Sequence, residues 1–270
     1  MINKCFGFIS WLPDNKENRK ARIERLNNAF KQIIDLFGED SEFLIIAQNW
    51  GDYKVPSFIK HSNIFKYGKL GILGARKKLR EHFLESTKYD YLIMCDDDIV
   101  LKAKDDNTIN EFNKALEDNP QGFWFPMYGW SLSFCAVSKW IYEKEEMVDV
   151  DPEKSEGYED TVFPYLLHYK YPKHEFKFDK LKFLQYQAQY HKDHKSTWAG
   201  IKGKKIDYRA LEEKSRLYKE EFEKGNYDIL SIKENISANW EQIKQEERRR
   251  KQAENPDLPL LDDCLDLYGY

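Results

Sequence analysis

The order of apolar runs and amphipathic segments near the start of the chain most constrains its fold. One compact apolar run spans Lys4 to Leu12 and ends at Pro13, and a second spans Ser41 to Trp50. Between them, apolar residues recur at helical spacing from Lys16 to Phe37, and Gly38 follows. Short apolar runs bounded by turn residues predict buried strands, whereas a period of three to four residues predicts a helix. We therefore expect a strand, a helix closed by a glycine C-cap, and a second strand.

The same order continues toward the middle of the chain. Asn63–Ser86 has the pattern of a short strand, a glycine-spaced turn and an amphipathic helix, and YLIMCDDDIVL, Tyr91–Leu101, has that of the next strand. A further helix is expected from Thr108 to Leu116. This order predicts an α/β domain with a mainly parallel central sheet flanked by helices. Its ligand-binding groups should gather at the carboxyl ends of the strands.

Composition limits the domain organisation and the partners. The chain has 270 residues, enough for one large domain with a sizeable core. Beyond residue 203 the sequence is highly charged and helix-patterned, so we expect a domain over 1–203 and a helical C-terminal extension with an acidic tail over 204–270. The net charge is −4 and no basic stripe dominates the first two hundred residues, so we expect no nucleic-acid partner.

Several features favour a cytoplasmic location. No run approaches the roughly 18 apolar residues of a membrane-spanning helix, and the N-terminal stretch lacks a basic region and a cleavage site for export. The four cysteines are scattered and form no CxxC pair, so we expect them to be reduced and buried; they are Cys5, Cys95, Cys135 and Cys264.

The acidic triplet in YLIMCDDDIVL is the strongest candidate for chemistry. Asp96, Asp97 and Asp98 end one apolar run and directly precede another. Burying carboxylates is costly unless a partner offsets their charge, and divalent cations such as Mg²⁺ prefer oxygen ligands. In an extended chain Asp96 and Asp98 point to one side and Asp97 to the other. The triplet therefore predicts a divalent-cation site, and the alternative is a polar turn.

A second acidic pair lies about sixty residues further on. Glu159 and Asp160 precede the sequence TVFPYLLHY. Proline is tolerated in the first turn of a helix, so Pro164 predicts that a helix begins within a few residues of Asp160. A carboxylate at that position can be held in one orientation, and taken alone the pair is typical of ordinary helix capping.

The joint pattern is more specific than either piece. It consists of GKLGILGARKKLREHFLE, an acidic triplet at a strand end about twenty residues later, an aromatic segment over Gly122–Trp140, GYED before a helix, and a strand end with histidines. Together these resemble the A-type glycosyltransferase (GT-A) fold, which is Rossmann-like, and most of all the large inverting family-2-like nucleotide-sugar transferases. The resemblance covers roughly Lys4 to Trp198.

The resemblance implies roles for the acidic residues. The DxD carboxylates of that family hold Mn²⁺ or Mg²⁺ and contact the nucleotide sugar, which implies these roles for Asp96 and Asp98. The middle residue, Asp97, is placed among the donor-binding residues with its role open. The Glu-Asp motif corresponds to Glu159 and Asp160, of which Asp160 is expected to be the base that deprotonates the acceptor hydroxyl.

The fold often takes a third metal ligand from a histidine near the end of the catalytic domain. QYHKDHKSTW offers His191 and His194, with no choice between them, and a solvated surface position is the alternative for each.

Other residues are expected to contact the two substrates. In LGILGAR, Gly71 and Gly74 are expected where backbone approaches closely, and Arg76 where a cation could bind the donor diphosphate, the alternative being a surface arginine at a helix start. The resemblance also implies that the loop at the end of the first strand contacts the nucleotide base, and Ser10, Trp11 and Asp14 are assigned to that loop.

The aromatic segment is expected to line the acceptor side. Tyr128 and Trp130 flank Gly129, and aromatic faces stack on sugars. Core packing is the competing interpretation for Trp124 and Phe125.

We therefore expect a metal-dependent, inverting glycosyltransferase that uses a UDP-sugar and a glycan or other hydroxyl acceptor, with possible self-association through the C-terminal helices. DDDIV also fits the nucleophile motif of haloacid-dehalogenase-like phosphatases, with Asp96 phosphorylated and Asp98 as acid-base, but that motif normally lies on the first strand. A nucleotidyltransferase of related fold is a further alternative, but the glycine-rich phosphate loop that would support it is missing near the start of this sequence. A catalytically silent carbohydrate-binding relative is the remaining alternative.

Overall fold

The computed structural model describes residues 2–97, 99–126, 131–147, 159–185 and 208–254. The chain forms two compact units, Met1–Gly225 and Asn226–Tyr270. The first unit holds the sheets, and the second holds α8 (Ile229–Glu254). None of the described helices combines the length and the apolar character needed to cross a membrane.

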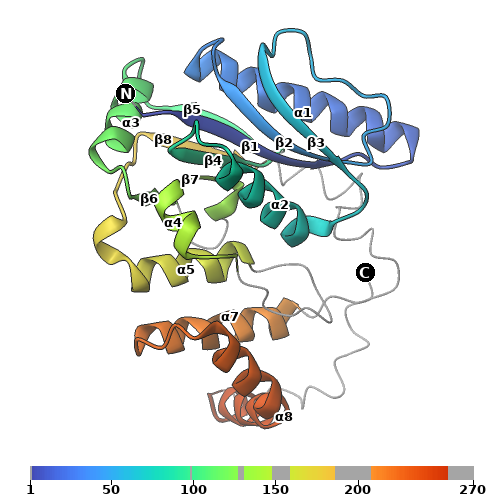
Figure 1. Cartoon of the computed structure of the whole chain (residues 1–270). Coiled ribbons are helices and arrows are strands. Elements are labelled where there is room, and N and C mark those ends of the chain that lie inside the picture. The colour runs from blue at the N-terminus through green and yellow to red at the C-terminus, as the bar shows by residue number, and fades with distance from the viewer. Residues whose placement is uncertain (1, 98, 127–130, 148–158, 186–207, 255–270) are drawn as a thin grey trace. The chain divides into compact units, whose positions relative to one another are not determined.

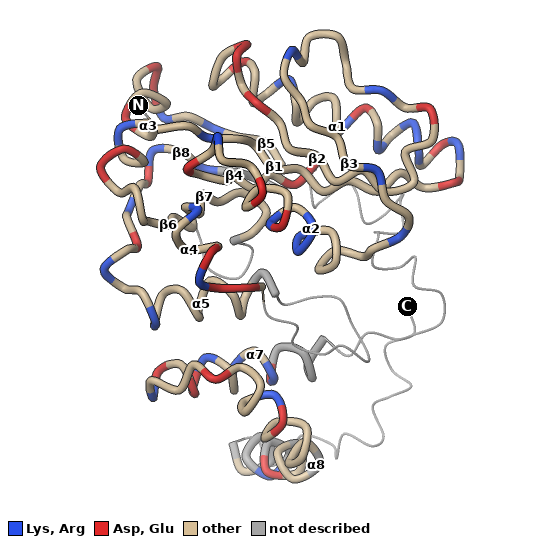
Figure 2. Tube along the Cα trace, viewed as in Figure 1, with Lys and Arg blue, Asp and Glu red and all other residues tan. Residues whose placement is uncertain are grey.

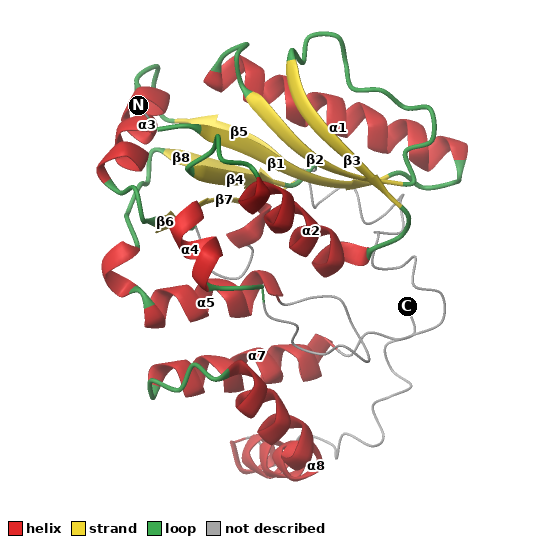
Figure 3. Ribbon diagram, viewed as in Figure 1, coloured by secondary structure: helices red, strands yellow, loops and turns green. Residues whose placement is uncertain are grey.

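A six-stranded sheet forms the centre of the first unit (Figures 1 and 3), in the order β3-β2-β1-β4-β7-β6. β1 pairs in parallel with both β2 and β4, and β2 in parallel with β3, whereas β7 is antiparallel to β4 and β6. The predicted α/β class with a mainly parallel sheet is confirmed. The strands are β1 (Lys4–Trp11), β2 (Glu42–Gln48), β3 (His61–Tyr67), β4 (Tyr91–Cys95), β6 (Phe123–Trp124) and β7 (Phe134–Ser138).

Helices cover both faces of this sheet, because successive strand side chains point to opposite faces. One core joins alternate strand residues such as Phe6 and Phe8 to Phe30 of α1 (Lys16–Phe37), and α3 (Thr108–Asp118) packs against the same core. The other core packs α2 against the opposite face of the sheet. It also includes α4 and α5; these helices are α2 (Gly71–Glu85), α4 (Lys139–Lys144) and α5 (Glu159–Lys170).

Gly7 allows α2 to lie close to β1. A Cβ atom at this position would lie 2.7 Å from Leu92 Cδ1 and 2.8 Å from Leu79 Cδ2. Neither side chain is exposed, so a larger residue would have to displace packed core atoms. The absence of a side chain at Gly7 therefore lets Leu79 of α2 pack directly against β1.

The predicted strand over Tyr91–Leu101 is two strands. β4 ends at Cys95, and after the acidic triplet the chain forms β5 (Ile99–Ala103). β5 leaves the central sheet and pairs antiparallel with β8 (Leu181–Gln185), with Ile99 opposite Gln185. The prediction of a single strand was wrong. The apolar pattern of Tyr91–Leu101 continues on both sides of the triplet, but β4 pairs with β1 and β7 whereas β5 pairs with β8. This unit also contains two short 3₁₀ helices, η1 (Ser131–Ser133) and η2 (Pro172–His174).

The helical pattern predicted after residue 203 is confirmed in α7 (Tyr208–Glu223) and α8. α7 belongs to the first unit and contacts α5, where the Tyr169 hydroxyl donates to Glu223 Oε1 at 2.6 Å. Both signs of charge are interspersed along α7 (Figure 2), including a Lys219–Glu223 pair at 3.5 Å. The predicted boundary at residue 203 lies outside the described residues.

Three of the four cysteines are free and buried, as expected: Cys5, Cys95 and Cys135. Cys264 lies outside the described part of the chain.

Candidate functional site

The carboxyl end of β4 brings an acidic and a basic side chain together. Asp96 follows the last residue of β4, and its N–H donates to the Ser133 carbonyl in η1 at 2.8 Å. Its Oδ1 lies 3.6 Å from Nη2 of Arg76 on α2. The Asp96 side chain is 24% exposed, whereas that of Arg76 is 5% exposed. Two residues predicted to contact the donor are therefore neighbours, with the carboxylate open to a ligand.

Arg76 lies in the second turn of α2, one turn after the start of the helix. Gly71 has a φ of 74°, a left-handed conformation that favours glycine. The Leu70 N–H donates to Gln48 Oε1 at 2.7 Å, which ties the helix start to the end of β2. The N-terminal end of a helix carries partial positive charge and favours anions. Gly74 shows no close approach within the protein, because a Cβ there would meet only Leu70 Cβ, at an ordinary 3.4 Å. The expected close approach of a ligand to the backbone of Gly74 stays a prediction.

Asp97 points to the opposite face of the sheet from Asp96, as the alternation of an extended chain predicts. Its Oδ1 lies 2.7 Å from Nη2 of Arg22 on α1, and its side chain is 2% exposed. Burial raises the pKa of the Asp97 carboxyl, and the charges of Arg22 and Arg25 partly counteract this rise. The other oxygen, Oδ2, has no hydrogen-bond partner among the described residues. Asp98 itself lies outside the described chain.

The predicted base-binding residues at the end of β1 face different surroundings. Ser10 is 1% exposed, and its Oγ has no hydrogen-bond partner within the described residues. Trp11 lies opposite Gln48 in the strand register and is partly exposed. Asp14 is exposed and accepts a hydrogen bond from Asn49 Nδ2 at 2.8 Å. The alternation of β1 directs Ser10 toward α1 and Trp11 toward α2, so Trp11 shares a face with Asp96.

Two residues that the sequence patterns did not single out organise the loops at these strand ends. Asn49 has a φ of 53°, and its Nδ2 also donates to the Leu12 carbonyl at 2.8 Å. Nη1 of Arg19 donates to the Asn49 carbonyl at 3.0 Å, and its Nη2 donates to the Trp50 carbonyl. Through these hydrogen bonds, Asn49 and Arg19 join the loop after β1 to the loop after β2. The only sequence signal for them was an asparagine directly after a strand.

The second acidic motif lies at a helix start, as predicted. α5 begins at Glu159 and contains Pro164 in its second turn, which confirms the placement of Glu159 and Asp160 in the first turn. The side chains of these two residues are outside what the structure describes. α5 contacts η1, whose Ser133 carbonyl binds the backbone of Asp96. The elements that carry the two acidic motifs are thus connected through η1.

β8 ends beside the residue that directly follows the acidic triplet. Its last residue, Gln185, lies opposite Ile99. The predicted histidine ligands, His191 and His194, lie outside the described residues, as do Asp98, Tyr128 and Trp130. Within the described ranges no group of three or more His, Cys, Asp or Glu side chains could hold a metal ion. Asp96 is the predicted metal ligand whose side chain the structure shows.

Core packing is confirmed for two aromatic residues of the aromatic segment. Trp124 is 1% and Phe125 6% exposed. The indole Nε1 of Trp124 donates to the Phe178 carbonyl at 2.9 Å, and its ring packs edge-on against Phe112 at 5.2 Å between centroids. These contacts leave Trp124 no free face for a sugar.

No protein-family model matches the chain, and no curated protein matches it. A search of solved structures finds 69 chains that resemble it. One is A197 from STIV, with 12% identity and a TM-score of 0.39 over 68% of this chain and 86% of that one. Another is TarS 1-349 from S. aureus, with 9% identity and a TM-score of 0.40 over 61% of this chain and 54% of that one. With TM-scores below 0.5, these likenesses assign no family, and the function rests on the residues of the site.

Proposed function

We propose that the chain is a metal-dependent glycosyltransferase that moves a sugar from a nucleotide-sugar, specifically a UDP-sugar, to an acceptor hydroxyl with inversion. The observation that carries this proposal is the pairing of Asp96 with Arg76. An accessible carboxylate and a buried guanidinium lie 3.6 Å apart at the carboxyl edge of a mainly parallel sheet, where α/β folds bind their ligands. A diphosphate accompanied by a divalent cation needs both kinds of group.

On the donor side, the Arg76 guanidinium would bind diphosphate oxygens, for which its planar fork is suited. Asp96 offers an accessible oxygen ligand, which fits a hard cation. Asp96 and Asp98, with His191 or His194, would hold Mn²⁺ or Mg²⁺, which supplies charge stabilisation for the leaving diphosphate. Trp11 and Asp14 would lie on the nucleotide side.

On the acceptor side, Asp160 would take the proton from the acceptor hydroxyl. The hydroxyl oxygen forms a bond to the anomeric carbon while the bond from that carbon to the diphosphate oxygen breaks, so a single displacement inverts the centre. The N-terminal end of α5 favours the ionised form of a carboxylate, which is the form that a base requires. Glu159 would assist in this site, and Tyr128 and Trp130 would contact the acceptor sugar.

A panel of nucleotide sugars, incubated with the protein with and without Mn²⁺, tests the proposal. We expect Mn²⁺-dependent donor hydrolysis, or transfer to an added sugar acceptor, with at least one donor. Asp106→Asn, which changes an exposed carboxylate after β5, should behave as the wild type. An absence of turnover and of nucleotide binding with every donor would contradict the proposal.

The phosphatase alternative is tested in the same assay. Hydrolysis of p-nitrophenyl phosphate with Mg²⁺, in the absence of any donor turnover, would favour a haloacid-dehalogenase-like activity. The acidic triplet follows β4, the fourth strand along the chain, and the guanidinium of Arg76 faces Asp96. The strand position supports the transferase, because the phosphatase motif normally lies on the first strand; the Arg76 guanidinium would suit either a diphosphate or a phosphate monoester.

A further inference from the structure

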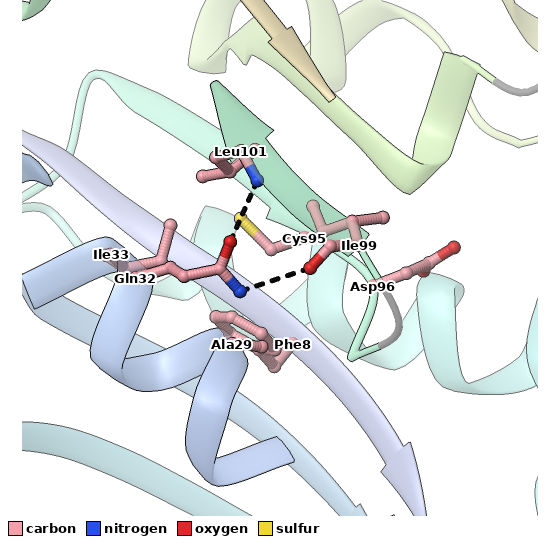
Figure 4. Close-up of a pocket in the computed structure, with 8 residues that line it drawn as sticks. All are labelled: Phe8, Ala29, Gln32, Ile33, Cys95, Asp96, Ile99 and Leu101. Atoms are coloured by element: carbon pink, nitrogen blue, oxygen red, sulfur yellow. Dashed lines mark hydrogen bonds between the residues drawn. The ribbon is translucent and has the colours of Figure 1, made fainter. Parts of the chain in front are cut away.

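Helix α1 contacts the connection between β4 and β5 on both sides of residue 98. On one side, Nη2 of Arg22 lies 2.7 Å from Oδ1 of Asp97. On the other, the Gln32 side-chain amide contacts β5 (Figure 4). The two contacts come from one helix and bind residues directly before and after the same position.

Gln32 replaces a neighbouring strand. Its Nε2 donates to the Ile99 carbonyl at 3.2 Å, and its Oε1 accepts from the Leu101 N–H at 2.8 Å. A residue of a parallel strand makes the same two bonds, to one carbonyl and to the N–H two residues later. β8 pairs with the other edge of β5. Gln32 therefore satisfies backbone groups on the second edge and fixes the path of the chain just after the acidic triplet.

The Arg22–Asp97 pair fixes the chain just before that position. The Asp97 side chain is 2% and that of Arg22 15% exposed. The carboxylate has one oxygen on Arg22, and its other oxygen has no hydrogen-bond partner in the described chain. A buried carboxylate that loses its partner is strongly unfavourable, so Arg22 determines which way Asp97 points. Since adjacent residues of an extended chain point to opposite faces, Asp96 is then directed toward Arg76.

We propose that Arg22 and Gln32 are positioning residues that hold the β4–β5 connection so that Asp96 stays directed toward the donor side. The inference rests on the proposed function. It gives Asp97 the role of an internal anchor in place of a donor contact. Neither Arg22 nor Gln32 touches the donor in this role, and both act through the chain that carries Asp96.

The test is the affinity for UDP in the presence of Mn²⁺, measured by calorimetry well below each variant's melting temperature. The variants are Arg22→Met, Asp97→Asn, the double variant that combines these two substitutions, and Gln32→Leu. We expect each variant to weaken UDP binding about tenfold. A loss of this size is typical when a residue that orients a metal ligand, without binding the metal itself, is removed. The double variant should lose no more than either single variant. Lys20→Met, an exposed position on α1, is the matched control and should bind as the wild type.

Arg22→Lys keeps the charge and provides a variant that is less disturbing to the fold. It should recover most of the affinity that Arg22→Met loses, because an ammonium can still pair with Asp97. Electron paramagnetic resonance of Mn²⁺ alone should show the same ranking of the variants, since positioning affects the metal ligands directly.

Two outcomes would overturn the inference while leaving the proposed function intact. In one, the variants melt earlier yet bind UDP as the wild type does, which would make the contacts purely structural. In the other, Asp97→Asn loses binding while Arg22→Met retains it, which would make Asp97 a donor contact. If the wild type fails to bind UDP with Mn²⁺, the proposed function fails, and the inference with it.

Discussion

The Asp96 carboxylate lies 3.6 Å from the Arg76 guanidinium, on the α2 side of the central sheet. Its neighbour Asp97 pairs with Arg22 on the α1 side. The charge of two adjacent carboxylates is thus offset by arginines from two helices on opposite faces. Because nearby positive charge stabilises carboxylates, the protein itself offsets part of the repulsion within the triplet. The accessible member, Asp96, remains available to a ligand.

Arg76→Met should weaken UDP binding roughly ten- to a hundredfold, because this is the usual loss of affinity when charge-assisted hydrogen bonds to a ligand are removed. Uridine, which lacks the diphosphate, should lose little affinity. Calorimetry with both ligands measures the difference. Lys77→Met, one residue further along α2, is the control. Equal losses for UDP and uridine would show that Arg76 does not act on the diphosphate.

Asp160→Asn should leave UDP and Mn²⁺ binding nearly unchanged and slow sugar transfer by on the order of 10²- to 10⁴-fold, the usual contribution of a general base. Binding by calorimetry and single-turnover transfer rates separate the two effects. If the variant instead loses nucleotide binding, Asp160 belongs to the donor site and the base lies elsewhere.

Gly7→Ala should lower the free energy of unfolding by about 1 to 3 kcal/mol, because its Cβ would overlap the Leu79 and Leu92 side chains. Gly68→Ala is the matched control, since a Cβ there meets no atom within 4 Å. Urea unfolding followed by circular dichroism compares the two. A similar stability for both variants would mean that α2 does not pack against β1 as closely as described.

Thiol labelling should be slow for the buried cysteines of the native protein. Burial raises the pKa of the thiols of Cys5, Cys95 and Cys135, so the reactive thiolate is disfavoured. At pH 8 the native protein should react with Ellman's reagent at no more than one of its four cysteines, and the denatured protein at all four. Rapid labelling of two or more would contradict this burial.

The sign of the accompanying pH effect follows from the same shifts. A thiol whose pKa is raised by folding stays protonated in the native state, whereas it ionises near its ordinary pKa of about 8.5 when unfolded. The stability that these thiols contribute is therefore complete below that pH and is lost as the pH rises above it. Urea unfolding at pH 7 and pH 9.5 should show the decrease.

Local sequence patterns predicted the elements whose signals are contiguous. The helix over Lys16–Phe37 has the predicted bounds, and Pro164 correctly indicated that α5 begins near Asp160. The alternation of an extended chain correctly placed Asp96 and Asp97 on opposite sides. These features depend on residues a few positions apart, which a single sequence displays directly.

Contacts between distant segments were not predictable in this way. The division of Tyr91–Leu101 into β4 and β5 depends on β8, which begins at Leu181. Arg22 and Gln32 look like ordinary polar positions of an amphipathic helix, and only the folded chain brings them to Asp97 and β5. No local pattern encodes such partners.

Calorimetric titration of UDP into the wild-type protein, with and without Mn²⁺, tests the central claim most directly when Asp96→Asn is measured beside it. We predict that UDP binds in a Mn²⁺-dependent manner, that Asp96→Asn abolishes or greatly weakens this binding, and that Asp106→Asn does not. UDP binding that is independent of Mn²⁺, or an Asp96→Asn variant that binds as tightly as the wild type, would contradict the claim that Asp96 serves a metal-bound nucleotide donor.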